Sequence, residues 1–376
     1  MIPFHFTGAR VLRPGGLIET PVGITEGRIV DAPCGRAVDA SGFLLLPGIV
    51  DPHGDGFERH LAPRRGAMLD MGDGLAMLAV ELAANGITTA MLAQFWSWEG
   101  GMRGPDFARA MLEAHAAVAP LQAVDLRVQL RVESHLLDDF DAIAACVERF
   151  GVGYVVFNDH LPHRQLSEGR KPPRLTGQAL KSGRSPEAHL ALMQALHQRS
   201  AEVGPAVAAL VARLPGVRFG SHDDDSAERR AFWRALGAGI SEFPETLEAA
   251  QAAVAAGEPV IMGAPNVVRG ASHAGKVSAQ ALIGQGLCAA LASDYHYPAP
   301  RQGALKLAET MGLEAAWALV SDGPARVLGM TDRGRIEAGL RADLLLLDPE
   351  TGRVGATVAG GRLAYLGPEM ASRFFG

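Results

Sequence analysis

Histidine and carboxylate side chains stand where several short apolar runs of this sequence end. His53 and Asp55 follow LLLPGIV, and Glu133 ends RVQLRVE. Imidazole and carboxylate groups together suit a borderline divalent ion such as Zn²⁺, and Mn²⁺ or Fe²⁺ fit the same donors. The sequence therefore predicts a metal site with these candidate ligands: His53, Asp55, Glu133, His160, His222 and Asp294.

The spacing of His53 and Asp55 places both on one side of an extended strand, because alternate residues of a strand point the same way. The whole set is too large for one tetrahedral ion, so we expect one ion or two, and Glu133 could bridge a pair. No lysine ends a strand-like run in the middle of the chain, which excludes a carbamylated lysine as the bridge.

Asp294 is the candidate catalytic residue. A divalent ion lowers the pKa of the water that it binds from about 15.7 to about 7. A carboxylate within hydrogen-bond reach can take the proton of that water and later pass it on. We predict Asp294 as this general base; the alternative is a helix cap after a buried strand. Asp51, Asp159 and the run Asp223–Asp225 could orient the histidines, or could be caps and turn residues. The possible orienting acids are Asp159, Asp223 and Glu242.

Strand-like runs alternate with alanine-rich helical stretches between the two ends of the chain, which is typical of parallel βαβ units. The eight runs are near 44–50, 86–92, 126–133, 152–158, 216–221, 239–243, 259–263 and 288–293. Eight such units predict an α/β fold, a closed (β/α)8 TIM-like barrel over residues 47–331. Catalytic groups of such barrels lie at the C-terminal ends of the strands, where the candidate ligands fall.

Both ends of the chain differ in pattern from the middle, because they consist of short extended runs between glycine turns. Both patterns favour β-strands, and chain termini often lie close together. We therefore predict one small β-sandwich domain made from residues 1–46 and 332–376.

Three segments carry cations that a polyanionic substrate would need. The apolar-poor loop 159–185 is basic and interrupts the barrel after the fourth strand, and such long loops are usually functional or disordered. A glycine-rich loop follows the seventh strand, and Arg59, Arg64 and Arg65 follow the first. The alternative is that these loops are simply solvated and that their charges only keep the protein soluble. The candidate substrate-binding residues in these loops are Arg164, Asn266, Arg269, His273 and Lys276.

The charge balance argues against other partners. With 35 basic and 41 acidic residues the net charge is −6, whereas nucleic acids and anionic membranes call for a basic surface. The sequence shows no signal peptide and no apolar run of the roughly 18 residues that a membrane span needs. The three cysteines stand far apart, so we expect a reducing, cytoplasmic location. Homo-oligomer formation is left open.

The sequence resembles the amidohydrolase superfamily in LPGIVDPHGD, in NGITT and in IEAGLRADLLLLD near the C-terminus. Other segments look like one branch, the α-D-ribose 1-methylphosphonate 5-triphosphate diphosphatase family of the carbon–phosphorus lyase pathway. They are DPHGDGFERHLAPR, LRVE, NDHLPHRQ, SHDDDSAE, SEFPETLEAA, GAPNVVRGASHAGKVSA and LASDY.

This resemblance implies a hydrolase of phosphonate catabolism that cleaves its triphosphate substrate to the 5-phosphate and pyrophosphate. It implies that the six candidate ligands surround the metal centre and that Arg164, Gln165, Arg269, His273 and Lys276 face the triphosphate. Glu242 stands where related deacetylases place a histidine ligand. His163 departs from the family pattern, which expects glycine there, and ASDYHYPAP differs after the eighth strand.

Two alternative functions remain at the level of the sequence. The first is a metal-dependent C–N hydrolase, such as a deacetylase or cyclic amidase, acting on an anionic small molecule; the fold alone favours it, while the cationic loops speak against it. The second is an inactive barrel that serves as a binding subunit, which metal analysis would test.

Overall fold

A computed structural model describes residues 2–64, 67–270 and 276–375. Its central element is an eight-stranded parallel sheet with the spatial order β15-β14-β13-β12-β11-β10-β9-β8. The strands are β8 (Ile49–Gly54), β9 (Ile87–Trp96), β10 (Asp125–Glu133), β11 (Tyr154–Asn158), β12 (Arg218–His222), β13 (Ile240–Glu242), β14 (Val260–Gly263) and β15 (Ala290–Ala292). Their residues are buried almost throughout, which fits strands covered on both faces.

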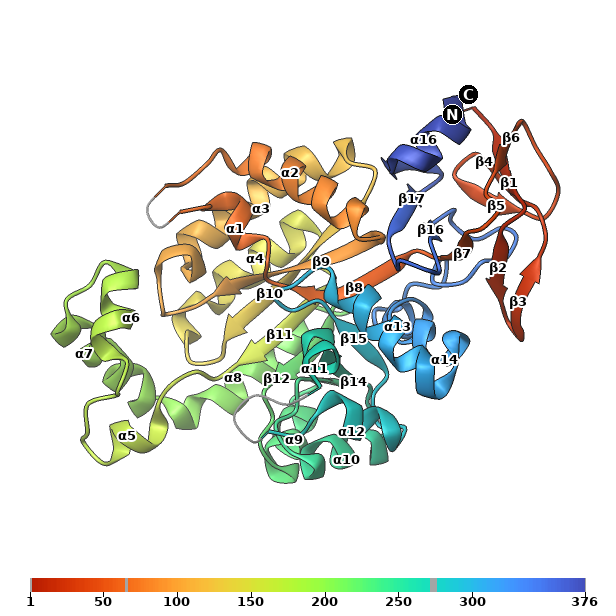
Figure 1. The fold of residues 1–376 in the computed structure, drawn as a ribbon. Helices are drawn as coiled ribbons and strands as arrows, with labels where there is room; N and C mark the ends of the chain where they lie inside the picture. The colour runs from red at the N-terminus through yellow and green to blue at the C-terminus, as the bar shows by residue number, and fades with distance from the viewer. Residues whose placement is uncertain (1, 65–66, 271–275, 376) are drawn as a thin grey trace. The chain divides into compact units, whose positions relative to one another are not determined.

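The first and last strands of this sheet lie side by side (Figure 1). Gly54 forms a parallel bridge with Asp294, the amide of Asp294 donates to the carbonyl of His53 (3.0 Å), and the amide of Asp55 donates to the carbonyl of Asp294 (2.9 Å). These bonds bring the two edges of the sheet together, so the predicted (β/α)8 barrel is confirmed.

The predicted single strand at 44–50 is wrong, because two strands occupy it. β7 (Leu44–Pro47) belongs to a separate antiparallel sheet, and β8 begins the barrel. Gly48 separates them, and a Cβ atom there would overlap the Thr88 side chain. The chain can change sheets at this point because glycine allows such a close approach.

Helices connect the barrel strands, and several begin at a side-chain cap. Asp70, Ser185, Ser226, Thr246 and Ser278 each accept a hydrogen bond from the backbone amide three residues ahead. The longer helices are α2 (Met71–Ala84), α3 (Pro105–Val118), α4 (Phe140–Phe150), α7 (Pro186–Gln198), α8 (Ser200–Arg213), α9 (Ala227–Ala235), α10 (Leu247–Ala255) and α13 (Ala299–Met311). Shorter ones are α1 (Glu58–Leu61), α11 (Ala264–Arg269), α12 (Ala279–Gly284), α14 (Leu313–Ala318), α15 (Asp322–Val327) and α16 (Pro368–Phe375).

Residues 159–185, expected to be a loop, contain two short helices, α5 (His163–Ser167) and α6 (Leu175–Ser182). Leu166 and Leu175 pack with Trp98 and with Met193 of α7 in a small apolar cluster. The sequence left open whether this segment is ordered, because each helix is too short to show a helical period.

Two further sheets come from the ends of the chain, as the sequence predicts. One has the order β5-β4-β1-β6 and the other β18-β17-β16-β7-β2-β3. Their strands are β1 (Phe4–Thr7), β2 (Arg10–Arg13), β3 (Gly16–Glu19), β4 (Val22–Thr25), β5 (Arg28–Val30), β6 (Arg36–Asp39), β16 (Leu344–Leu347), β17 (Val354–Ala359) and β18 (Arg362–Leu366). Phe6, Ile24, Leu45, Leu346 and Val358 share one buried core.

The chain divides into two compact units. The first comprises residues 1–92, 117–127 and 259–376, and the second comprises residues 93–116 and 128–258. The domain boundaries at 46 and 332 stay a prediction. Among the described residues, every helix falls short of the length and apolarity needed to cross a lipid bilayer.

The break at Gly48 gives a test of the fold. We expect Gly48→Ala to lower the free energy of unfolding by about 1–3 kcal/mol, because the added methyl group overpacks the contact with Thr88. Gly153→Ala is the matched control, since a Cβ atom there meets no atom within 4 Å among the described residues other than its chain neighbours. Urea unfolding of both variants measures the difference. Equal free energies of unfolding would contradict the close contact between Gly48 and Thr88.

Candidate metal centre

Three predicted site residues converge where β8 meets β15, all within the first unit. His53, Asp55 and Asp294 each offer one ligand atom, and these atoms lie within 4.8 Å of one another. His53 is fully buried in β8, and Asp294 follows β15 with a left-handed φ of 56°. The backbone bonds that close the barrel therefore also bring this group together.

Asp51 fixes the end of β15 from β8. Its carboxylate accepts hydrogen bonds from the amide of Ser293 (2.8 Å) and from the Ser293 hydroxyl (2.6 Å). Burial raises the pKa of Asp51, and the two bonds from Ser293 oppose that rise. Because Ser293 precedes Asp294 in the chain, Asp51 is a positioning residue for the candidate base.

Glu133 and His160 form a buried pair in the second unit. Nδ1 of His160 lies 2.5 Å from Oε1 of Glu133, whose Oε2 accepts from the His160 amide (3.1 Å) and from the indole of Trp98 (3.1 Å). Burial acts to raise the pKa of Glu133, but the neighbouring His160 outweighs it and leaves that pKa lowered. Burial acts to lower the pKa of His160, but Glu133 leaves it raised. The lowered pKa means that the Glu133 carboxylate favours its ionised form, which is the form that binds a cation.

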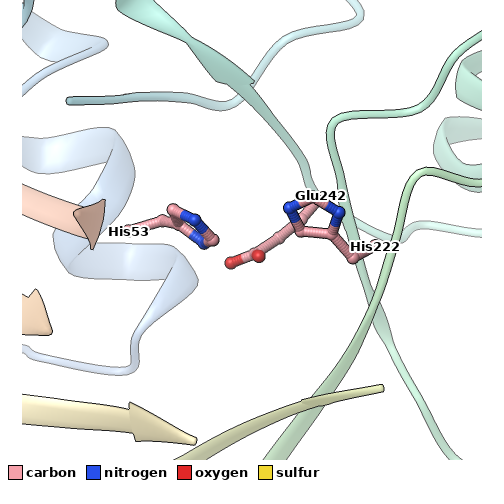
Figure 2. Close-up of side chains that lie close together, drawn as sticks. All are labelled: His53, His222 and Glu242. Carbon is pink, nitrogen blue, oxygen red and sulfur yellow. The ribbon is translucent and has the colours of Figure 1, made fainter. Parts of the chain in front are cut away.

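His222 and Glu242 are direct partners in the register of β12 and β13. Figure 2 shows the side chains of His222 and Glu242, which end these two neighbouring strands. His222 also contacts Nη2 of Arg131 (3.0 Å) through Nε2 and Asp223 (3.1 Å) through Nδ1. Glu242 therefore lies beside His222, one of the predicted ligands, in the register of the two strands.

Polar side chains of β10 and β11 hold Glu242 in place. Gln129 (2.5 Å) and the hydroxyl of Tyr154 (2.8 Å) donate to Oε1 of Glu242. Burial, with Glu242 next, raises the pKa of Tyr154 well above its usual value, so the hydroxyl stays a donor. Gln129 and Arg131 were missed by the sequence analysis, although their alternation with Glu133 in a buried strand is a readable signal.

Of the predicted orienting acids, Asp223 lies beside His222, whereas Asp159 belongs to a different group. Asp159 contacts His135, His163 and Arg229. Burial acts to raise the pKa of Asp159, but His163 and the other cations lower it to about 2. Neither His135 nor His163 was among the predicted ligands.

The predicted substrate-binding residues are distributed over several elements. Arg164 and Gln165 lie on α5, and the Arg164 side chain is 82% exposed beside Glu168. Asn266 and Arg269 lie on α11, with the Arg269 guanidinium 5.7 Å from the ring of Tyr295. Lys276 is exposed. His273 and Arg65 lie outside the described residues. The role of these residues toward a triphosphate stays a prediction.

The donors present fit a divalent cation. Imidazole nitrogens and carboxylate oxygens are the ligands of Zn²⁺ in hydrolase sites. Asn158, at the end of β11, is 1% exposed, and neither polar atom of its side chain has a hydrogen-bond partner among the described residues. Such a buried amide calls for a ligand or an ordered water.

Comparison with known proteins agrees with this chemistry. The α-D-ribose 1-methylphosphonate 5-triphosphate diphosphatase of Escherichia coli (strain K12) is 32% identical over 325 residues, covering 83% of this chain and 85% of the relative. The chain belongs to this diphosphatase family. No protein-family model matches the chain.

Solved structures place the family in the amidohydrolase fold. N-acetylglucosamine-6-phosphate deacetylase from Pasteurella multocida has a TM-score of 0.64 at 10% identity, covering 96% of this chain and 99% of its own. An amidohydrolase from a Sargasso Sea sample has a TM-score of 0.63 at 16% identity, covering 97% and 93%. At these identities the likeness shows the fold alone.

The support for Glu242 can be tested on the metal-free protein. We expect Tyr154→Phe to lower the free energy of unfolding by about 1.5–3 kcal/mol, because a buried charged acceptor loses one of its donors. Tyr365→Phe, on the partly exposed strand β18, is the control. Urea unfolding in the presence of a chelator measures both, and a Tyr154→Phe variant as stable as the control would argue against the interaction.

Proposed function

We propose that this protein is a metal-dependent phosphoanhydride hydrolase that converts α-D-ribose 1-methylphosphonate 5-triphosphate to the 5-phosphate and pyrophosphate. The observation that carries the proposal is the convergence of His53, Asp55 and Asp294 on the closing strands of the barrel, in a chain of this diphosphatase family. Glu133, His160 and His222 would complete the donor set, with Glu242 beside them.

The donors suit Zn²⁺, and Mn²⁺ or Fe²⁺ are the alternatives. A bound divalent ion would supply charge neutralisation on the phosphate oxygens and would lower the pKa of water. Asp294 would take the proton as water attacks phosphorus, and it would hold that proton as the anhydride bond between the α- and β-phosphates breaks. The electron pair of that bond leaves with pyrophosphate, so the products balance water plus substrate.

The chain's cations would bind the triphosphate. The proposed contacts come from Arg164, Gln165, Asn266, Arg269, His273 and Lys276. Positioning and charge stabilisation supply most of the rate enhancement in phosphoryl transfer, because little covalent chemistry falls to the protein. Arginine at two of these positions suits bidentate contacts with phosphate oxygens.

A C–N hydrolase is the competing function, since the deacetylase from Pasteurella multocida shares the fold. Both reactions need the same donors and base. The basic character of α5 and α11 favours the triphosphate, because an amide substrate requires no polyanion-binding cations.

The reaction is tested by pyrophosphate release from the ribosyl triphosphate with added Zn²⁺. We expect Asp294→Asn to lower kcat at least about 100-fold, because it removes the proton acceptor. Asp141→Asn is the control, since that side chain is 98% exposed. Absence of pyrophosphate release together with hydrolysis of an N-acetylated sugar phosphate would instead establish the C–N hydrolase.

The substrate charge is tested by Arg269→Ala. We expect KM for the triphosphate to rise by roughly 10-fold or more, because a charge-assisted contact is lost. Arg149→Ala, at a 68% exposed side chain on α4, is the control and should leave KM unchanged. Steady-state kinetics with a triphosphate and a monophosphate substrate measure both variants, and an unaltered KM in Arg269→Ala would remove this residue from the proposed site.

A further inference from the structure

A second group of metal-type ligands lies within the second unit, apart from the six predicted ligands. His135 follows β10, Asp159 follows β11, and His163 begins α5. One ligand atom from each of the three lies within 4.8 Å of the others. Asp159 and His160 are consecutive, yet Asp159 contacts this group while His160 pairs with Glu133.

The distances within the group match a coordination sphere. Nδ1 of His135 lies 3.5 Å from Oδ1 of Asp159, and Nε2 of His163 lies 2.9 Å from the same oxygen. Two ligand atoms on a tetrahedral Zn²⁺ with bonds of about 2.0–2.1 Å are about 3.3 Å apart. A small shift of the side chains therefore suffices to admit an ion.

The hydrogen bonds around His135 leave its Nδ1 as an acceptor. The Ser200 hydroxyl donates to the carbonyl of His197 (2.6 Å) and lies 3.3 Å from Nε2 of His135. The single hydrogen of the Ser200 hydroxyl is used in the bond to the His197 carbonyl. Nε2–H of His135 therefore donates to Ser200 Oγ, and the imidazole lone pair of His135 is on Nδ1. The Ser134 hydroxyl, 3.3 Å from Nδ1, is within reach to donate to this lone pair. The Nδ1 lone pair of His135 then lies near Oδ1 of Asp159, and a cation between the two atoms would be bound by both.

The other two ligands are also held by outer partners. Arg229 donates to Oδ2 of Asp159 (2.6 Å), and Nε2 of His163 lies close to both oxygens of that carboxylate, 2.9 Å from Oδ1 and 3.0 Å from Oδ2. Nδ1 of His163 contacts Nδ1 of His197 (2.8 Å), which orients the ring with Nε2 toward Asp159. Metal-binding histidines and carboxylates characteristically have such partners.

Burial leaves one side of the group open. The side chains of His135 and Asp159 are 3% and 9% exposed, whereas that of His163 is 33% exposed. An ion could therefore enter past His163, and a water could take a fourth position.

We propose that His135, Asp159 and His163 form a second divalent-cation site, which binds Zn²⁺ or a similar borderline ion. The bound ion joins the ends of β10 and β11 to the start of α5. It thereby fixes the segment that α5 and α6 add to the barrel, independently of which substrate the enzyme hydrolyses.

The experiment measures Zn²⁺ bound per full-length chain after equilibration with buffered free Zn²⁺ and removal of excess metal. We expect His163→Gln to bind one equivalent fewer than the wild type, while His115→Gln, on α3, binds the same number as the wild type. Equal equivalents in all three proteins would overturn the proposal, and so would an equal loss in both variants.

A second measurement does not depend on any variant folding. Crystals of the wild-type protein grown with Zn²⁺ are examined by anomalous scattering at the zinc edge. A peak bonded to Nδ1 of His135, Oδ1 of Asp159 and Nε2 of His163 supports the site. A well-ordered cluster without a peak, at a Zn²⁺ concentration that loads other sites, shows that the group is only a hydrogen-bonded network and overturns the proposal.

Discussion

Closure of the barrel between β8 and β15 is the constraint on which the candidate centre depends. The Asp51 carboxylate accepts hydrogen bonds from the amide and the hydroxyl of Ser293. The next residue, Asp294, forms a parallel β-bridge with Gly54. The chain segments involved are about 240 residues apart in sequence, so a long loop is closed to bring them together. The backbone hydrogen bonds that close the sheet also hold His53 and Asp294 near each other. The closed barrel and the candidate centre therefore depend on the same interactions.

The second unit buries two acidic side chains of the candidate centre, and both have partners. Glu133 is met by His160 and Trp98, and Glu242 by Gln129 and Tyr154. Burying charged groups costs several kcal/mol each unless such partners are present. These partners hold both carboxylates in place, and His160 keeps the pKa of Glu133 lowered, which suits a carboxylate that binds a metal ion. The amidohydrolase fold and membership of the diphosphatase family agree with it.

Most strands and the triad His53, Asp55 and Asp294 could be predicted because the signals are local. A buried parallel strand is a short apolar run, and its C-terminal end is marked by the polar residue that follows. The strand at 44–50 was misassigned because LLLPGIV is one continuous apolar run that crosses from β7 into the start of β8. Only the tight contact of Gly48 with Thr88 shows where the chain changes sheets, and Thr88 lies in another strand.

The sequence by itself determined the barrel class, the order of its strands and the kinds of ligand available, because periodicity and residue type are properties of short segments. The tertiary structure alone decided how those ligands are grouped. Asp159 and His160 are adjacent in the chain, yet they join different clusters, one with His135 and His163 and the other with Glu133. Which atoms come within a few ångströms depends on strand register and helix placement, and these follow from packing of the whole chain.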